Sequence, residues 1–249
     1  MEARIEPFLL NSNKNYNDAK ITTIQLNRIG HQNGITSNQT LLLQQEKLKT
    51  HQNSPLIFTV DEVFSHAECL SFIELSHQYD YETADIFVNS TRQVLTNVRN
   101  NKRVIYDDIQ LAETLFSKLK HLLPEQLNGW TLSGLNERFR FYRYENGETF
   151  RPHWDGIYEV NDWHSSQLTL LIYLSEDFTG GETIFYRDSG MLKPCKETQI
   201  ANIKPKLGQI LVFERQQLHE GAPVLSGQKY VLRTDVMYKH PMILESKDC

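Results

Sequence analysis

Cysteine is scarce in this chain, long apolar runs are missing, and basic residues are not in excess. The three cysteines, Cys69, Cys195 and Cys249, cannot all pair and have no metal-binding spacing. So few thiols favour a reducing compartment over a disulfide-stabilised secreted fold. No apolar run approaches the roughly 18 residues that a membrane span requires. A net charge of −5 argues against nucleic acid as the main partner.

The first ten residues are acidic and contain no long apolar stretch, so they do not resemble a signal peptide. We therefore expect a cytoplasmic protein with neither a membrane nor a nucleic-acid partner. Its substrate would be a small molecule or a peptide. The sequence leaves the oligomeric state open.

The 249 residues suit one sizeable domain with an extension. Residues 1–54 are rich in Asn, Gln, Lys and Thr, which favours a partly flexible polar extension. Within it, 21–26 and 41–43 are candidates for an edge strand or a brief helix. We expect the folded domain over residues 55–242 and a short tail over 243–249.

Two helices are predicted early in the domain, after a core strand at 56–60. Ser65 and Glu68 have the spacing of a capping box, followed by a helical apolar face. Asp107 or Asp108 caps a second helix, which ends before Pro124. The chain beyond Gly129 is strand-like, with runs at 139–144, 168–174, 183–186, 209–213 and 230–238. This order predicts an α+β, mainly β fold, with N-terminal helices buttressing a sandwich or barrel.

The sequence His153-Trp154-Asp155 is the strongest chemical signal in the chain. On an extended strand, side chains alternate, so His153 and Asp155 point to one face. One further imidazole, from His219, completes two nitrogens and one carboxylate. Three such ligands with open positions are typical of non-haem Fe(II) oxygenases.

The context of these residues strengthens the prediction. A turn at 145–147 and a strand precede His153, and the strand at 209–213 precedes His219. Two other interpretations stay open: hydrogen-bonded surface residues, or a catalytic zinc site, which also uses three ligands. Zinc ranks lower because the glutamate or cysteine pattern of zinc hydrolases is missing.

Four segments resemble the prolyl 4-hydroxylase-like branch of the 2-oxoglutarate- and Fe(II)-dependent dioxygenases: QLTLLIYL (167–174), GGETIF (180–185), PKLGQILVF (205–213) and HEGAPV (219–224). The resemblance covers residues 55–240 and is densest over 137–238. It implies a double-stranded β-helix, or jelly roll, with iron held by His153, Asp155 and His219. It also implies 2-oxoglutarate and O2 as co-substrates, with ascorbate as a supporting reductant and succinate and CO2 as products.

The distal carboxylate of 2-oxoglutarate requires a fixed cation, because an unpaired buried charge is costly. The resemblance places that cation on the strand after His219, where Lys229 follows ten residues later. Arg233 competes from the same strand face, about 13 Å further along, and arginine can grip a carboxylate with two hydrogen bonds. We favour Lys229 by position. Alternatively, Lys229 is an exposed edge residue and Arg233 pairs with Asp235.

The resemblance also places two tyrosines, Tyr144 and Tyr173, where family hydroxyls hold the co-substrate. Either tyrosine can instead be a core aromatic whose hydroxyl is satisfied elsewhere. Gly180 and Gly181 are predicted to form a tight turn rather than a ligand contact. His164, in an expected loop, and His240, beyond the last strand, are not expected to bind iron.

A set of basic residues is a candidate for the rim of the site, where it would receive an acidic or amide-bearing substrate. Its members are residues 99–103 (RNNKR) with Arg138, Arg140, Arg143 and Arg151. Solvated surface charge is the alternative interpretation.

Together these features predict a hydroxylase that acts on a C–H bond of a prolyl residue, a free amino acid or another small metabolite. Asp155 fills the position that halogenating relatives leave for chloride, which favours hydroxylation. The rival hypothesis is a non-catalytic sensor module that binds the metal and 2-oxoglutarate on the same scaffold. That hypothesis predicts that the iron ligands or the cation that binds the acid would have been replaced, and all of these residues are present.

Overall fold

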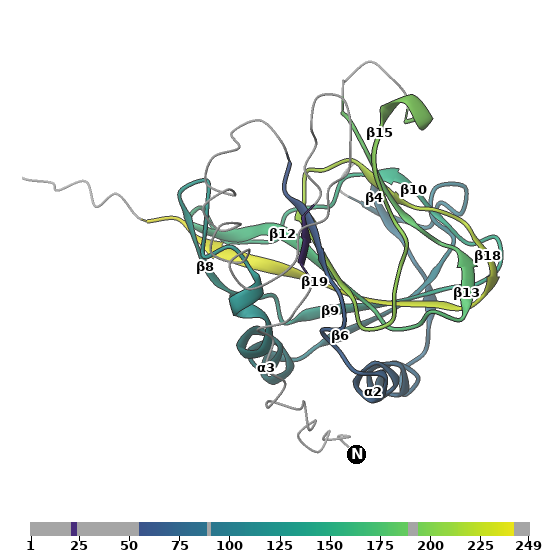
Figure 1. The fold of residues 1–249 in the computed structure, drawn as a ribbon, viewed down its shortest axis with the longest axis horizontal. Helices are drawn as coiled ribbons and strands as arrows, with labels where there is room; N and C mark the ends of the chain where they lie inside the picture. The colour runs from purple at the N-terminus through teal and green to yellow at the C-terminus, as the bar shows by residue number, and fades with distance from the viewer. Residues whose placement is uncertain (1–20, 24–54, 89–90, 189–193, 242–249) are drawn as a thin grey trace, which may run out of the picture.

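The computed structural model describes residues 21–23, 55–88, 91–188 and 194–241 (Figure 1). The helical elements are α2 (His66–Ser76), α3 (Ile109–Leu119), η2 (Lys120–Leu122) and η3 (Lys196–Thr198). The strands are β1 (Ile21–Thr23), β2 (Ile57–Val60), β3 (Glu82–Thr83), β4 (Ile86–Val88), β5 (Thr91–Gln93), β6 (Lys102–Asp107), β7 (Gln126–Leu127), β8 (Trp130–Leu135), β9 (Arg138–Tyr144), β10 (Phe150–His153), β11 (Glu159–Asn161), β12 (His164–Tyr173), β13 (Phe178–Gly180), β14 (Thr183–Tyr186), β15 (Gln199–Ile203), β16 (Ile210–Glu214), β17 (His219–Gly221), β18 (Val224–Gly227) and β19 (Lys229–Lys239).

The strands form a double-stranded β-helix, as predicted. The larger sheet has the order β1-β2-β16-β12-β19-β9-β6-β3, with β7, β8 and β11 attached beside it. The smaller sheet has the order β10-β17-β14-β15. Non-consecutive strands are neighbours in both sheets, so the chain winds between them. Figure 1 shows α2 and α3 together on one side of the β-structure, below β6 and β9.

Both predicted helix caps are present. The Ser65 hydroxyl accepts from the Glu68 N–H (3.2 Å), and the Glu68 carboxylate accepts from the Ser65 N–H (2.7 Å). This reciprocal pair is a capping box. Helix α3 begins after Asp108, whose carboxylate accepts from the Leu111 N–H (2.9 Å).

Two hydrophobic clusters share the larger sheet as a common wall. Strand β9 shows the division: Phe139 and Phe141 belong to the cluster that includes the helices, whereas Tyr142 and Tyr144 belong to the cluster between the sheets. This alternation follows from the two-residue period of a strand. Every inward-facing position on β9 and β19 is therefore a candidate lining of the interior.

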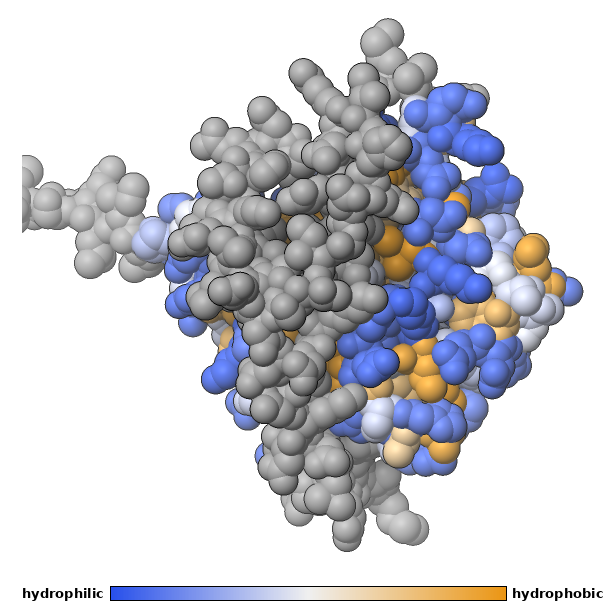
Figure 2. Space-filling model, viewed as in Figure 1, coloured by the Kyte–Doolittle hydropathy of each residue, from blue (hydrophilic) through white to orange (hydrophobic). Residues whose placement is uncertain are grey.

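Part of the polar extension joins the fold. β1 pairs with β2 in the register Ile21↔Val60, so residues 21–23 form an edge strand within the predicted 21–26 segment. The other candidate, 41–43, and the tail at 243–249 lie outside the described residues. No helix in the described ranges is long and apolar enough to cross a membrane. On the face drawn in Figure 2, hydrophilic side chains separate small apolar areas over most of the surface that is coloured.

A pair of glycine substitutions tests how closely the chain packs around the turn at Gly208. Gly147 (φ +81°) and Gly208 (φ +71°) are both left-handed, but a Cβ on Gly147 would meet no atom within 4 Å. A Cβ on Gly208 would overlap the Phe64 carbonyl oxygen. We expect Gly147→Ala to cost about 1 kcal/mol of unfolding free energy and Gly208→Ala about 3 kcal/mol or more. Urea denaturation measures both, and equal losses would contradict the packing argument.

Candidate functional site

His153 and His219 are brought together by strand pairing. They are direct cross-strand partners in the antiparallel pair β10·β17, which places both rings on one face. Asp155 lies two residues beyond the end of β10, so the strand is shorter than the sequence suggested. The Asp155 N–H donates to the Arg215 carbonyl (3.1 Å), which holds this segment beside the sheet.

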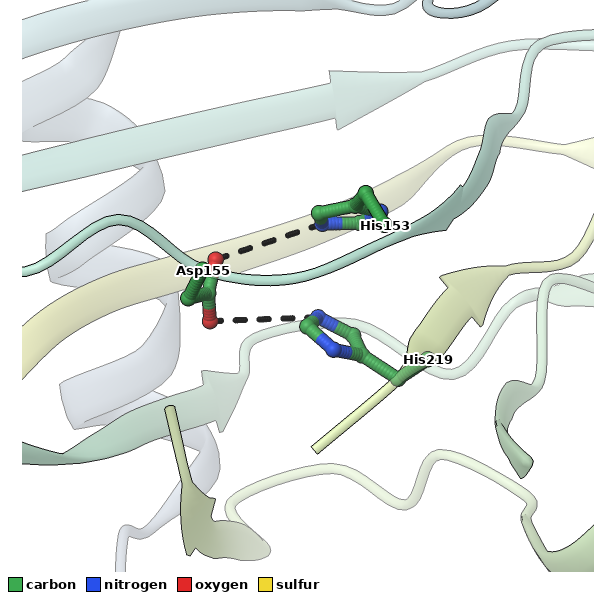
Figure 3. Close-up of side chains that lie close together, drawn as sticks. All are labelled: His153, Asp155 and His219. Atoms are coloured by element: carbon green, nitrogen blue, oxygen red, sulfur yellow. Dashed lines mark ion pairs between the residues drawn. The ribbon is translucent and has the colours of Figure 1, made fainter. Parts of the chain in front are cut away.

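The three side chains converge on one point (Figure 3). Asp155 Oδ1 lies 3.9 Å from His153 Nε2, and Asp155 Oδ2 lies 3.8 Å from His219 Nε2. One ligand atom from each residue falls within 4.8 Å of the other two. Trp154, between His153 and Asp155 in the sequence, is 54% exposed. The geometry is that of a three-ligand metal site.

The hydrogen bonds of the two imidazoles fix which nitrogen is free. His153 Nδ1 lies 2.8 Å from the Arg151 carbonyl, and His219 Nδ1 lies 2.9 Å from the Gln217 carbonyl. A carbonyl only accepts, so Nδ1 carries the proton in each ring and Nε2 keeps its lone pair. Metal-binding histidines characteristically donate their second N–H in this way. The donor set therefore fits a divalent transition metal.

The electrostatics of the site favour neutral imidazoles and an ionised carboxyl. Burial lowers the pKa of His153 well below its usual value, and the neighbouring His219 adds to this; burial also lowers the pKa of His219. Burial opposes the charged form of Asp155, but the Arg233 guanidinium outweighs it, and the hydrogen bond from Thr169 also helps to hold its pKa low. These protonation states are the ones that metal binding requires.

Aromatic rings enclose the histidines. Phe150 stacks on His153, with centroids 3.4 Å apart and planes 15° from parallel. Phe213 packs against His219 at 4.6 Å. Behind Phe150, the Arg99 guanidinium lies 4.2 Å from that ring and 4.6 Å from Tyr142. The rings are thus held from behind by a dry, packed layer.

Lys229 lies inside the barrel with its amine buried; the residue is 3% exposed. Its Nζ donates to the Gly181 carbonyl (2.6 Å), and among the described residues no carboxylate is within ion-pair distance of it. Burial lowers the pKa of Lys229 to about 7, against a smaller opposing effect of Glu182. A buried amine without a counterion is suited to an incoming carboxylate.

The two predicted tyrosines flank Lys229. Its Nζ lies 5.2 Å from the Tyr144 ring centroid and 5.6 Å from that of Tyr173. The Tyr173 hydroxyl is 2.7 Å from the Thr183 hydroxyl. Burial raises the pKa of both tyrosines, so their hydroxyls stay protonated. The turn at Gly180 and Gly181, both with positive φ, supplies the carbonyl that Lys229 uses.

Arg233 has different neighbours. Its Nη2 lies 3.2 Å from Asp155 Oδ1 and 3.0 Å from Asp235 Oδ1. The pairing with Asp235 is the alternative that the sequence left open. The contact with Asp155 was not foreseen, because nothing in the spacing relates β19 to the segment after β10.

The basic residues near the site have separate roles. Arg99 is buried, and its Nε donates to Asn101 (2.8 Å). Arg138 forms a two-bond pair with Asp107, and Arg143 pairs with Glu145. Arg151 is exposed. The set therefore does not form one continuous exposed patch, and most of its charge is already engaged.

The other two histidines considered, His164 and His240, contact residues other than the three metal ligands. His164 begins β12 instead of lying in a loop, and it hydrogen-bonds Ser133 (3.2 Å). His240 packs against Trp130. Two contributors were missed from sequence: Thr169, which donates to Asp155 Oδ2 (2.6 Å), and Thr183. The sequence did offer a signal for Thr169: it is four residues from Tyr173 on β12, and strand alternation puts both side chains on the same, inward face.

Comparisons with known proteins agree with this geometry. The family model of the 2OG-Fe(II) oxygenase superfamily matches residues 139–234. Prolyl 4-hydroxylase 2 of Arabidopsis thaliana is 25% identical over 225 residues, covering 79% of this chain and 72% of that protein.

Two solved structures share the fold. A prolyl hydroxylase from Trichoplax adhaerens, in complex with a peptide fragment of the hypoxia inducible factor oxygen degradation domain, has a TM-score of 0.57 and 15% identity. The match covers 80% of this chain and 89% of the Trichoplax adhaerens chain. A Pseudomonas putida prolyl-4-hydroxylase has a TM-score of 0.55 and 14% identity, with 81% of this chain and all of that chain covered.

A jelly roll with two imidazoles and one carboxylate at an open metal site defines a non-haem iron oxygenase. This chain belongs to the 2-oxoglutarate/Fe(II)-dependent oxygenase superfamily, in its prolyl 4-hydroxylase-like branch. It is an enzyme of the dioxygenase class, and the family implies Fe(II), 2-oxoglutarate and O2 as its reactants and cofactor.

Removing one imidazole should abolish metal-dependent stabilisation. Anaerobic Fe(II) at a hundredfold excess over its dissociation constant contributes about 2.7 kcal/mol to the folded state, which corresponds to a melting-temperature rise of about 5–10 °C for a domain of this size. We expect the rise in the wild type and its loss in His153→Ala and His219→Ala. The matched control is His164→Ala, which should keep it. Equal rises in all four proteins would contradict the site.

Proposed function

We propose that this protein hydroxylates an unactivated C–H bond, with a prolyl residue of a peptide as the favoured acceptor. In the balanced reaction, substrate C–H, O2 and 2-oxoglutarate give substrate C–OH, succinate and CO2. One oxygen atom enters the alcohol and the other enters succinate. Two observations together carry the proposal: the three-ligand metal site, whose histidines stand on the smaller sheet, and the buried Lys229 amine on β19 of the larger sheet. Among the described residues this amine has a backbone carbonyl and no carboxylate as its partner.

Each side chain has a defined task in this scheme. His153, Asp155 and His219 would hold Fe(II), which supplies the redox chemistry that activates dioxygen. Lys229 would exchange its bond to the Gly181 carbonyl for the distal carboxylate of 2-oxoglutarate. Tyr144 and Tyr173 would form the walls around that carboxylate. The packed rings of Phe150 and Phe213 exclude water from the histidines.

The prolyl acceptor is supported by the relatives and not by a residue of this chain. The relative from Arabidopsis thaliana is named a prolyl 4-hydroxylase, and the Trichoplax adhaerens structure holds a peptide on the same fold. A free amino acid or another small metabolite is the second acceptor class. We also place the protein in the cytoplasm as part of the proposal, which the free thiols of Cys69 and Cys195 support.

The decisive experiment measures succinate formed from 2-oxoglutarate with Fe(II), ascorbate and candidate acceptors. Proline-containing peptides should stimulate turnover above the uncoupled rate and gain one oxygen atom by mass spectrometry. The same peptides with alanine in place of proline are the matched control, and free L-proline tests the second class. His153→Ala should form no succinate. Turnover that is the same in His153→Ala and wild type would refute the enzyme assignment for this site.

The affinity for 2-oxoglutarate should depend on pH through Lys229. With a pKa of about 7 in the free protein, its amine is charged below pH 7 and increasingly neutral above it. Only the charged amine pairs with a carboxylate, so binding above pH 7 must take up a proton. The dissociation constant should therefore be flat below about pH 6 and rise by up to roughly tenfold per pH unit above 7.

Anaerobic calorimetry in two buffers with different ionisation enthalpies measures both the affinity and the proton uptake. Lys229→Arg is the matched control, because arginine stays charged throughout this range. Its affinity should be independent of pH. Lys229→Met should weaken binding by roughly tenfold or more, the loss expected for one charged hydrogen bond. A flat pH profile in the wild type would contradict the role of Lys229.

A further inference from the structure

Four charged side chains form an alternating row that begins at the metal site and runs outward along the barrel wall. Asp155 contacts Arg233, Arg233 contacts Asp235, and Asp235 Oδ2 lies 3.4 Å from Arg140 Nη1. Arg233 and Arg140 are cross-strand partners on β19 and β9. The row places a guanidinium in direct contact with the one anionic member of the ligand set.

The Asp155 carboxylate is held from both sides. Arg233 Nη2 lies 3.2 Å from Oδ1, and the Thr169 hydroxyl donates to Oδ2 (2.6 Å). The side chain of Asp155 is only 6% exposed, so water contributes little to fixing it. Two contacts to two different oxygens define the plane of the carboxylate as well as its position.

Arg233 is itself fixed by the next layer. Asp235, 3% exposed, accepts from Arg233 (3.0 Å) through Oδ1 and from the Asn136 amide (3.1 Å) through Oδ2. Thr169 and Asp235 are cross-strand partners, so the hydroxyl that holds Asp155 and the carboxylate that holds Arg233 stand on one rung of the sheet. A buried carboxylate that neither binds metal nor faces solvent has a structural reason here: it orients the guanidinium.

We propose that Arg233 is a positioning residue that limits Asp155 to one metal-binding oxygen, leaving adjacent coordination positions for 2-oxoglutarate. The inference rests on the proposed iron site. Asp155 Oδ1, the oxygen that Arg233 contacts, also lies 3.9 Å from His153 Nε2. An oxygen committed to a guanidinium is a poorer metal donor, which leaves Oδ2 as the better one. Released from Arg233, Asp155 can offer both oxygens and occupy a position that the 2-oxo acid needs.

This role differs from the other one considered for Arg233, direct binding of the distal carboxylate. Two 2-oxo acids separate the roles: 2-oxoglutarate has a distal carboxylate, and 2-oxobutyrate lacks it. A residue that binds the distal carboxylate affects only 2-oxoglutarate. A residue that acts through Asp155 affects the chelating end, which both acids share.

The experiment titrates each acid into the anaerobic Fe(II) protein and follows the visible charge-transfer band of the chelate. The test variant is Arg233→Met/Asp235→Asn. It removes the pair together because Arg233→Met alone would leave the buried Asp235 with Arg140, 3.4 Å away, as its only cation among the described residues. We expect it to keep the Fe(II)-dependent thermal shift and to bind both acids about tenfold more weakly or worse, a loss of about 1.4 kcal/mol. Asp235→Asn alone keeps Arg233 and should lose less. Lys229→Met should weaken 2-oxoglutarate only.

Several results would overturn the inference. If the double variant weakens 2-oxoglutarate but not 2-oxobutyrate, Arg233 binds the distal carboxylate. If it weakens neither, the row is structural only. Should the double variant not fold, Arg233→Lys carries the same two-acid comparison. A wild type that binds no Fe(II) would remove the proposed function, whereas a normal wild-type chelate with an unchanged variant would remove this inference alone.

Discussion

The structure depends on keeping one carboxylate ionised inside a protein wall. Asp155 sits where burial disfavours charge, and it stays charged because the Arg233 guanidinium and the Thr169 hydroxyl contact its two oxygens. The two histidines beside it must instead be uncharged to bind a metal, and burial favours their uncharged form by lowering their pKa. One environment therefore produces both protonation states, and the donor set is ready for a divalent ion before the ion arrives.

The two cations on β19, Lys229 and Arg233, have different partners inside the barrel. Lys229 has a backbone carbonyl as its partner, whereas Arg233 is committed to two carboxylates. They stand on the same face of one strand, separated by four residues. In the proposed reaction, 2-oxoglutarate would therefore meet the Lys229 amine, which has no carboxylate partner among the described residues, and a neutralised row at Arg233. This difference would orient the co-substrate with its distal carboxylate toward Lys229.

Local signals in the sequence predicted much of this. The capping box at Ser65 and the cap at Asp108 depend on neighbours within four residues, and both helices begin where they were expected. The jelly roll followed from the resemblance and from helices preceding strands. His153 and Asp155 were linked by strand parity, although β10 ends at His153 and a bond to Arg215 carries the geometry further.

Contacts between distant segments were not predictable in the same way. Arg233 meets Asp155 across 78 positions of the chain, and only the sheet order relates them. Strand β6 was missed because three of its six residues are charged and its apolar run, 104–106, is only three residues long. Arg99 was considered only as a rim residue or as a solvated surface charge, yet it is buried and lies between two aromatic rings that offset its burial. These charged residues are tolerated inside the fold because partners from distant segments contact them, and a single sequence does not show which segments meet.

The exposed position of Trp154 between two metal ligands has an evolutionary consequence. Trp154 is 54% exposed, whereas the side chains of His153 and Asp155 turn toward the metal site (Figure 3). Replacements at this exposed position can therefore change the protein surface without removing a metal ligand on either side. Proteins that evolve from such a scaffold can therefore vary at this position while they keep the same metal ligands.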